Sequence, residues 1–72
     1  SVRIALMTIF INGDVRELEG VETLSDLLDT LGLAKQRIAI EVNKKVIRKQ
    51  EWETALIADQ DKVEIVHFVG GG

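Results

Sequence analysis

The side chains that could take part in catalysis are few in this sequence. His67 is the only histidine, Ser1 and Ser25 are the only serines, and there is no cysteine. A hydrolase needs a nucleophile activated by a base, and these residues do not make up a Ser-His-Asp or Cys-His set. One imidazole without carboxylates at ligand spacing does not indicate a metal, and no glycine loop of the phosphate-binding type occurs. We therefore predict no enzyme, no catalytic side chain, and no bound metal or cofactor.

The last three residues offer chemistry of a different kind, which belongs to the backbone. The sequence closes on HFVGGG, an apolar segment followed by Gly70, Gly71 and Gly72. Residues without a Cβ form a flexible, narrow tail that can enter a channel too tight for side chains. The carboxylate of Gly72 could be joined to AMP as a mixed anhydride, which a sulfur nucleophile attacks to give a thiocarboxylate. Partner enzymes would catalyse these steps, and this protein would supply the arm.

Composition and charge narrow the class of protein further. The formal net charge is -3 and the pI is about 5.0, which disfavours nucleic acid as a partner. No apolar run is long enough to span a membrane and no secretory leader is visible, so we expect no membrane contact and a cytoplasmic location. The length predicts one domain over residues 1–72. Met7 is a candidate natural start, with residues 1–6 left over from cloning.

A basic cluster interrupts this acidic background. Lys44, Lys45, Arg48 and Lys49 fall close together in the sequence. Short charge clusters are usually solvated surface, and this is the favoured interpretation. The alternative is a docking patch for an acidic partner.

The elements that would position the tail can be predicted from local patterns. Asn12-Gly13 separates two apolar runs and predicts a hairpin of strands at 5–11 and 15–18. A helix should run from Thr23 as N-cap to Gly32 as C-cap, with Ser25 on its polar face. Its apolar positions recur at helical spacing and predict one buried face. These are Leu24, Leu27, Leu28 and Leu31.

The second half of the chain is predicted to form three strands and a helical turn. Residues 38–43, 46–47 and 62–69 favour strands, residues around 49–56 favour a helical turn, and Trp52 is expected to close the core. The order β-β-α-β-β-β predicts an α+β domain of the β-grasp, or ubiquitin-like, type, with a mixed sheet and the helix packed on one face.

The two faces of the last predicted strand differ in character. Val63, Ile65 and His67 should share the inner face, with His67 hydrogen-bonded at the edge of the core. The outer face carries Val66 and Phe68, where alternation would place polar residues. Either this face docks a partner or Phe68 folds back onto the core, and the sequence favours neither.

Two segments resemble a known family. VNKKVIRKQEW (residues 42–52) and DQDKVEIVHFVGGG (residues 59–72), together with the overall length, are similar to the ThiS family, the sulfur carriers of thiamin biosynthesis. The resemblance covers nearly all of residues 7–72. It departs at Asp59-Gln60-Asp61, where the family often has a glycine in the turn.

The resemblance implies a set of partners. In this family the terminal glycine is adenylated by the E1-like enzyme ThiF, which consumes ATP. A sulfur-donating enzyme then helps to form the thiocarboxylate, which delivers sulfur to the thiazole synthase ThiG. Gly71 and Gly72 match the family's terminal pair, and Val66 and Phe68 match positions near the tail that would face the partners.

Two alternatives remain open at this level. MoaD, the small subunit of molybdopterin synthase, has the same fold and a Gly-Gly end, but usually carries a proline shortly before it, and this chain has no proline. The other alternative is a ubiquitin-like domain that binds partners without covalent chemistry.

Overall fold

The computed structural model describes residues 6–69, so Gly70, Gly71, Gly72 and residues 1–5 lie outside the described part. The elements follow the predicted order β-β-α-β-β-β. They are β1 (Met7–Ile11), β2 (Asp14–Leu18), α1 (Leu24–Leu31), β3 (Ile38–Val42), β4 (Lys45–Ile47), a 3-10 turn η1 (Lys49–Glu51) and β5 (Lys62–His67).

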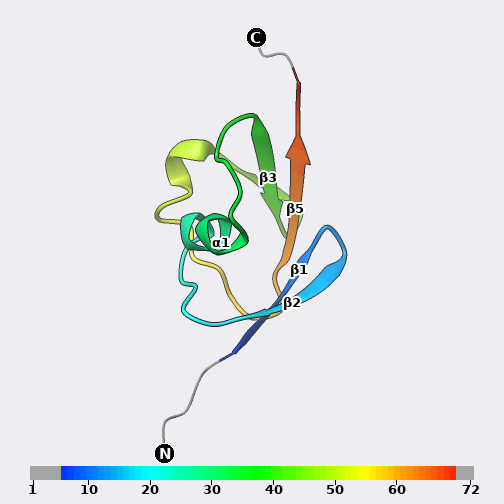
Figure 1. The fold of residues 1–72 in the computed structure, drawn as a ribbon, viewed down its shortest axis with the longest axis vertical. Coiled ribbons are helices and arrows are strands. Elements are labelled where there is room, and N and C mark those ends of the chain that lie inside the picture. The colour runs from blue at the N-terminus through cyan, green and yellow to red at the C-terminus, as the bar shows by residue number, and fades with distance from the viewer. Residues whose placement is uncertain (1–5, 70–72) are drawn as a thin grey trace, which may run out of the picture.

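The five strands form one mixed sheet in the order β2-β1-β5-β3-β4, and α1 lies against one of its faces (Figure 1). The last strand of the chain, β5, is therefore the central one. It runs parallel to β1 and antiparallel to β3, while each outer strand is joined to its neighbour by a hairpin. The predicted α+β, β-grasp architecture is confirmed.

The last strand is shorter than predicted. β5 ends at His67, and not at Val69, because its neighbour β3 begins at Ile38, the residue that pairs with His67. One more hydrogen bond, from the Phe68 N–H to the Arg37 carbonyl over 2.9 Å, continues the contact. Val69 lies past this bond and is 96% exposed. The first strand is also shorter, since Leu6 is described but lies before β1.

Both hairpins turn through asparagines in the left-handed region. Asn12 and Gly13 have φ values of 49° and 87°, as the Asn-Gly pair predicts for a two-residue turn. Asn43 and Lys44 have φ values of 53° and 69° in the second hairpin. The side chain of each asparagine also forms hydrogen bonds with β5. The Asn12 amide bonds the backbone N–H and C=O of Ile65, and the Asn43 side-chain oxygen accepts from the Lys62 N–H at the start of the strand.

The helix starts and ends where the sequence predicts. The Thr23 hydroxyl accepts from the Asp26 N–H over 3.1 Å, the Asp26 carboxylate accepts from the Thr23 N–H over 3.0 Å, and Gly32 closes the helix at φ 69°. The leucines on one side of α1 meet the inner face of the sheet. The largest fully buried side chains are Ile9, Leu24, Leu27, Leu28, Ile40 and Val63.

Trp52 closes the core beyond the helix, as predicted. Its side chain is buried, and its indole N–H donates to the Ile47 carbonyl over 3.0 Å, so the polar edge of the ring has a partner. The backbone on either side of Trp52 holds the start of α1: the Ser25 N–H donates to the Trp52 carbonyl, and the Leu24 N–H donates to the Ala55 carbonyl, both over 2.9 Å.

This packing changes the place of Ser25. The prediction that Ser25 lies on the polar face of α1 is wrong, because the segment around Trp52 covers it and leaves it 9% exposed. Its hydroxyl accepts from the Lys35 ammonium over 2.7 Å, and Lys35 also pairs with Asp29 over 2.9 Å. Ser25 is thus a bonded structural residue.

Candidate functional site

The candidate site begins with β5, the strand that leads toward the glycines. Its first half is held on both sides, by pairs of Lys62 and Val63 with β1 and by Val63 and Glu64 with β3. Its second half is held by β3, through pairs that extend to His67. A central strand with partners along its length has little freedom to change direction, so the fold sets the direction in which the chain leaves the sheet (Figure 1).

The three glycines themselves lie outside the described residues. The roles given to Gly70, Gly71 and Gly72 therefore stay predictions. What the structure describes is the base of the tail: the last backbone hydrogen bond at Phe68, followed by the exposed Val69.

Beside this exit, the sheet face that does not contact α1 carries exposed apolar residues. Val66 is 58% exposed and Phe68 is 47% exposed, so Phe68 does not fold back into the core. Val66 lies opposite the exposed Ala39 of β3. Two apolar residues next to the base of the tail form a surface that a partner could cover.

The strand register adds a further residue that sequence reasoning missed. Glu41 pairs with Glu64 on one side and with Val46 on the other, so Val46 shares the face of Glu64 and Val66. Val46 is also exposed. We call these residues the docking face: Ala39, Glu41, Val46, Glu64, Val66 and Phe68. The sequence alone gives little indication that Val46 lies on this face, because the face on which its side chain lies follows from its pairing with Glu41 of β3.

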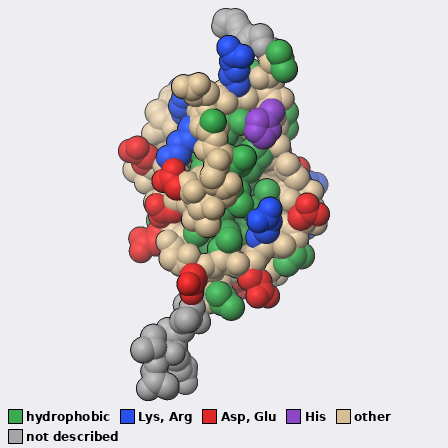
Figure 2. All heavy atoms as spheres, in the orientation of Figure 1, with side chains coloured by type: hydrophobic (Ala, Val, Ile, Leu, Met, Phe, Trp, Pro, Cys, Tyr) green, Lys and Arg blue, Asp and Glu red, His purple; other side chains and the backbone are tan. Residues whose placement is uncertain are grey.

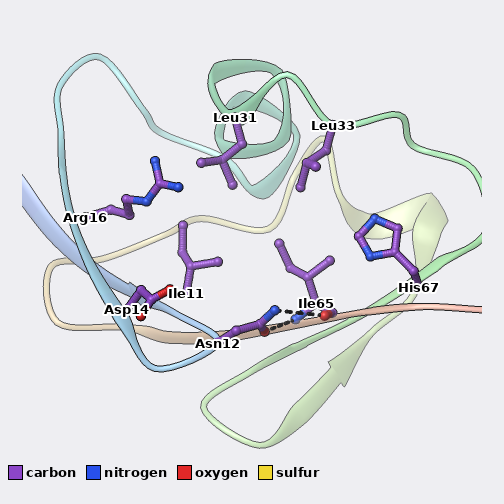
Figure 3. A pocket seen from close by; sticks show the side chains of 8 residues that line it. All are labelled: Ile11, Asn12, Asp14, Arg16, Leu31, Leu33, Ile65 and His67. Atoms are coloured by element: carbon purple, nitrogen blue, oxygen red, sulfur yellow. Dashed lines mark hydrogen bonds between the residues drawn. The ribbon is translucent and has the colours of Figure 1, made fainter.

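His67 lies on the opposite face, as predicted, and opens onto a hollow of about 260 Å³ between the β1–β2 hairpin and the end of α1 (Figure 3). Figure 2 shows apolar side chains in the floor of this hollow with the histidine beside them. The expected local hydrogen bond of His67 is not found among residues 6–69. The lining residues are Ile11, Asn12, Asp14, Arg16, Leu31, Leu33, Ile65 and His67.

The residues of the basic cluster lie on different elements of the fold. All four side chains are exposed, but they belong to different parts of the fold. Lys44 lies in the second hairpin turn and Lys45 on β4, whereas Lys49 lines a separate hollow together with Lys35 and Trp52. Arg48 precedes η1, where its N–H donates to Glu51. Solvated surface stays the favoured interpretation of the cluster, and a docking patch for an acidic partner stays the alternative.

Other kinds of site receive no support from the part of the chain that the structure describes. Within residues 6–69 no group of three or more His, Cys, Asp or Glu side chains is placed to hold a metal ion. None of the described helices is both long and apolar enough to cross a membrane.

The arrangement defines a class of protein: a ubiquitin-like β-grasp domain whose central strand leads to a glycine end. Residues 9–72 match the family model described as "ThiS family". The chain therefore belongs to the ThiS family.

Relatives with known names agree with this assignment. The chain is 40% identical to the sulfur carrier protein ThiS of Bacillus subtilis, over 86% of this chain and 96% of that protein. It is 38% identical to a thiazole synthase of Magnetococcus marinus over 92% of this chain, but it spans only 20% of that protein's length. A second thiazole synthase, from Paramagnetospirillum magneticum, is 36% identical and is likewise matched over 20% of its length.

The fold has a similar solved structure. The crystal structure of a thiamine biosynthesis protein (ThiS) from Geobacter metallireducens superposes with a TM-score of 0.78 at 29% identity, covering 92% of this chain and all of that one.

Proposed function

We propose that this protein carries sulfur for thiazole formation in thiamin biosynthesis, with the carboxylate of Gly72 as the reactive group. The observation that carries the proposal is that β5 is the central strand of the sheet and that the glycines, which follow it in the sequence, fall within the family match. An E1-like enzyme of the ThiF type would transfer AMP from ATP to the Gly72 carboxylate and release pyrophosphate. A sulfur nucleophile supplied by a sulfur-donating enzyme would displace AMP, which leaves the thiocarboxylate.

In this proposal the partner enzymes perform the chemistry and this protein supplies the reactive carboxylate. We assign the chemical steps to partner enzymes, in line with the membership of the chain in a family of sulfur carriers. Gly70 and Gly71 have no Cβ and would pass through a narrow entrance to a partner's active site. The protein is then a co-substrate that is consumed and regenerated, and not a catalyst.

We assign the final acceptor of sulfur to a thiazole synthase of the ThiG type. The similarity of this chain to a fifth of two thiazole synthases supports the assignment, since a domain of this kind occurs together with that activity. Val66 and Phe68, next to the base of the tail, would contact the partners while the glycines are in the active site.

Intact mass tests this chemistry directly. The chain is incubated with ATP, a ThiF-type adenylating enzyme and a sulfur donor, and we expect first an AMP adduct and then the exchange of one oxygen for sulfur. Deletion of Gly72 should abolish both products and leave the folded core intact, as judged by the near-UV signal of the buried Trp52. An unchanged mass with an enzyme that modifies the Bacillus subtilis carrier would refute the proposal.

Co-purification from the source organism identifies the pathway. Recovery of a ThiF-type enzyme and a thiazole synthase with the tagged chain is expected. Recovery of a molybdopterin synthase large subunit instead would assign the chain to the MoaD branch.

A further inference from the structure

The strand β2 forms one edge of the described sheet. The sheet order places β2 and β4 at its two edges, and within residues 6–69 no strand pairs with the outer side of β2. β4 has only three residues, whereas β2 has five. The first four residues of β2, Asp14 to Glu17, are exposed, so α1 does not cover this strand either. A longer exposed edge is a template for pairing with another strand.

Hydrogen bonds on the far side of β1 show which groups of β2 face the open edge. The Phe10 N–H donates to the Asp61 carbonyl over 2.9 Å, and the Thr8 carbonyl accepts from the Gln60 N–H over 2.6 Å. Both bonds point away from β2. Directly opposite residues of an antiparallel pair turn their backbone groups either toward each other or away from each other.

The partners of Phe10 and Thr8 across the ladder are Val15 and Glu17. The N–H and C=O groups of Val15 and Glu17 therefore point outward, to the open edge. These are the groups that a further strand would pair with.

The side chains of β2 are complementary to themselves in one antiparallel register. When Val15 lies opposite Val15 of a second copy, Asp14 lies opposite Arg16 of that copy, and Arg16 lies opposite its Asp14. All four charged side chains are on the α1 side, because Asp14 and Arg16 pair with Ile11 and Ile9 of β1, and Ile9 is fully buried beneath the helix. Opposite charges directly across a strand pair are stabilising.

The neighbouring registers are unfavourable. Centring the pair on Arg16 places two guanidinium groups opposite each other. It also brings together residues whose N–H and C=O groups point toward β1, so that they cannot bond across the new edge. Centring the pair on Glu17 again brings outward-pointing N–H and C=O groups together. It places two carboxylates opposite each other, however, which is destabilising. Charged residues usually protect an edge strand from pairing, whereas here their order selects one register.

We propose that the β2 edge is a self-association surface, on which β2 of a second copy pairs antiparallel with Val15 at the two-fold axis. The five-stranded sheets of the two copies then form one continuous sheet. The axis is perpendicular to the sheet, so both docking faces lie on the same side and the two β5 strands run in opposite directions. Dimerisation through β2 does not depend on the chemistry of Gly72. The contact is small, so the association is reversible and depends on concentration.

Charge reversal tests the register. Sedimentation equilibrium across a concentration series measures the dissociation constant of the unmodified chain and of the variants Asp14→Arg and Arg16→Asp. Each single variant places two like-charge pairs in the interface, so the dissociation constant should rise at least about tenfold. The double variant Asp14→Arg/Arg16→Asp has the original net charge and restores both opposite pairs, so its affinity should return to within about threefold.

Hydrogen exchange locates the contact independently. The Val15 amide should exchange quickly in dilute samples and slowly in concentrated ones, whereas the Asp14 and Arg16 amides, which face β1, should be unaffected. Glu53→Arg, an exposed change of the same charge as Asp14→Arg, is the matched control and should leave association unchanged. A chain that stays monomeric, or a dimer that the double variant does not restore, overturns the proposal. A dimer without protection of Val15 uses another surface and overturns it too.

Discussion

The side-chain amide of Asn12 holds the backbone of Ile65 by two hydrogen bonds. The Ile65 N–H donates to Asn12 Oδ1 over 2.7 Å, and Asn12 Nδ2 donates to the Ile65 carbonyl over 3.1 Å (Figure 3). The parallel ladder between β1 and β5 has paired residues only at Phe10 with Lys62 and Ile11 with Val63. The Asn12 side chain thus continues this ladder beyond the end of β1 and supports the half of β5 that leads to the tail.

Removal of this amide should destabilise the domain. Asn12→Gly keeps the positive φ of 49° without strain and leaves the Ile65 N–H and C=O without their partner. We expect a loss of about 1–3 kcal/mol in the free energy of unfolding, measured by urea denaturation. Asn12→Ala should cost about 1 kcal/mol more, because alanine also carries the left-handed penalty. A glycine variant as stable as the original would show that water replaces the amide at no cost.

The turn at Asp59-Gln60-Asp61, where the sequence departs from the family resemblance, places a residue with a side chain in the left-handed region. Gln60 adopts φ 74°, and the turn is tied to β1 by a bond from the Thr8 N–H to the Asp59 carboxylate over 2.7 Å. Gln60→Gly should therefore remove a left-handed penalty of about 1–2 kcal/mol against an entropy cost of about 0.5–1 kcal/mol. We expect a net gain of about 0.5 kcal/mol in urea denaturation.

Gln60→Ala is the control for this turn. It keeps the left-handed penalty and removes only the side chain, whose one hydrogen bond, to Asp59 over 3.4 Å, is exposed. Its stability should stay within about 0.5 kcal/mol of the original. A glycine variant that is less stable than the alanine variant would contradict the strain at Gln60.

Asp26 should make stability depend on pH in the acid range. The backbone N–H groups of Thr23 and Glu22 donate to its carboxylate, and these bonds hold the pKa of Asp26 below its usual value. The folded state therefore binds the proton less readily than the unfolded state. The resulting stability is fully present above the unfolded pKa of about 4 and is lost as the pH falls through the lower folded value.

The variant Asp26→Asn isolates this contribution. Thermal unfolding should show the original chain more stable than the variant at neutral pH, with a difference that shrinks as the pH falls below about 4. Glu53→Gln, which neutralises a carboxylate at an exposed turn position, is the control and should leave the stability at neutral pH within about 0.5 kcal/mol of the original. A difference that is constant with pH would assign the effect of Asp26 to helix propensity and not to its charge.

The docking face should affect the carrier reaction and not the stability of the fold. Val66→Ala and Phe68→Ala change exposed side chains, so the free energy of unfolding should move by no more than about 0.5 kcal/mol. If these residues are central contacts with the adenylating partner, kcat/KM for adenylation should fall about tenfold. The control Leu56→Ala removes a side chain that is 76% exposed, from a residue that pairs with Thr23 at the start of α1 and is not part of the docking face. Equal rates for all three variants would show that the partner recognises another surface.

Short-range patterns in the sequence were sufficient to predict the order of the elements. The Asn12-Gly13 turn, the Thr23 cap and the Gly32 stop each depend on a few adjacent residues, so their geometry follows from local sterics and hydrogen bonding. The leucine spacing of α1 and the burial of Trp52 were predicted for the same kind of reason. The resemblance to the ThiS family also came from the sequence alone and is confirmed by the family match.

Contacts between distant segments decided the rest. β5 ends at His67 because β3 begins at Ile38, Ser25 is covered by the backbone around Trp52, and Val46 joins the docking face through its register with Glu41. Each of these depends on a pairing between residues far apart in the chain or on different strands, which periodicity within one strand does not encode. The sequence alone determined which elements form and that glycines follow the last strand. The tertiary structure decided that this strand is the central one and which side chains surround the point where the chain leaves the sheet.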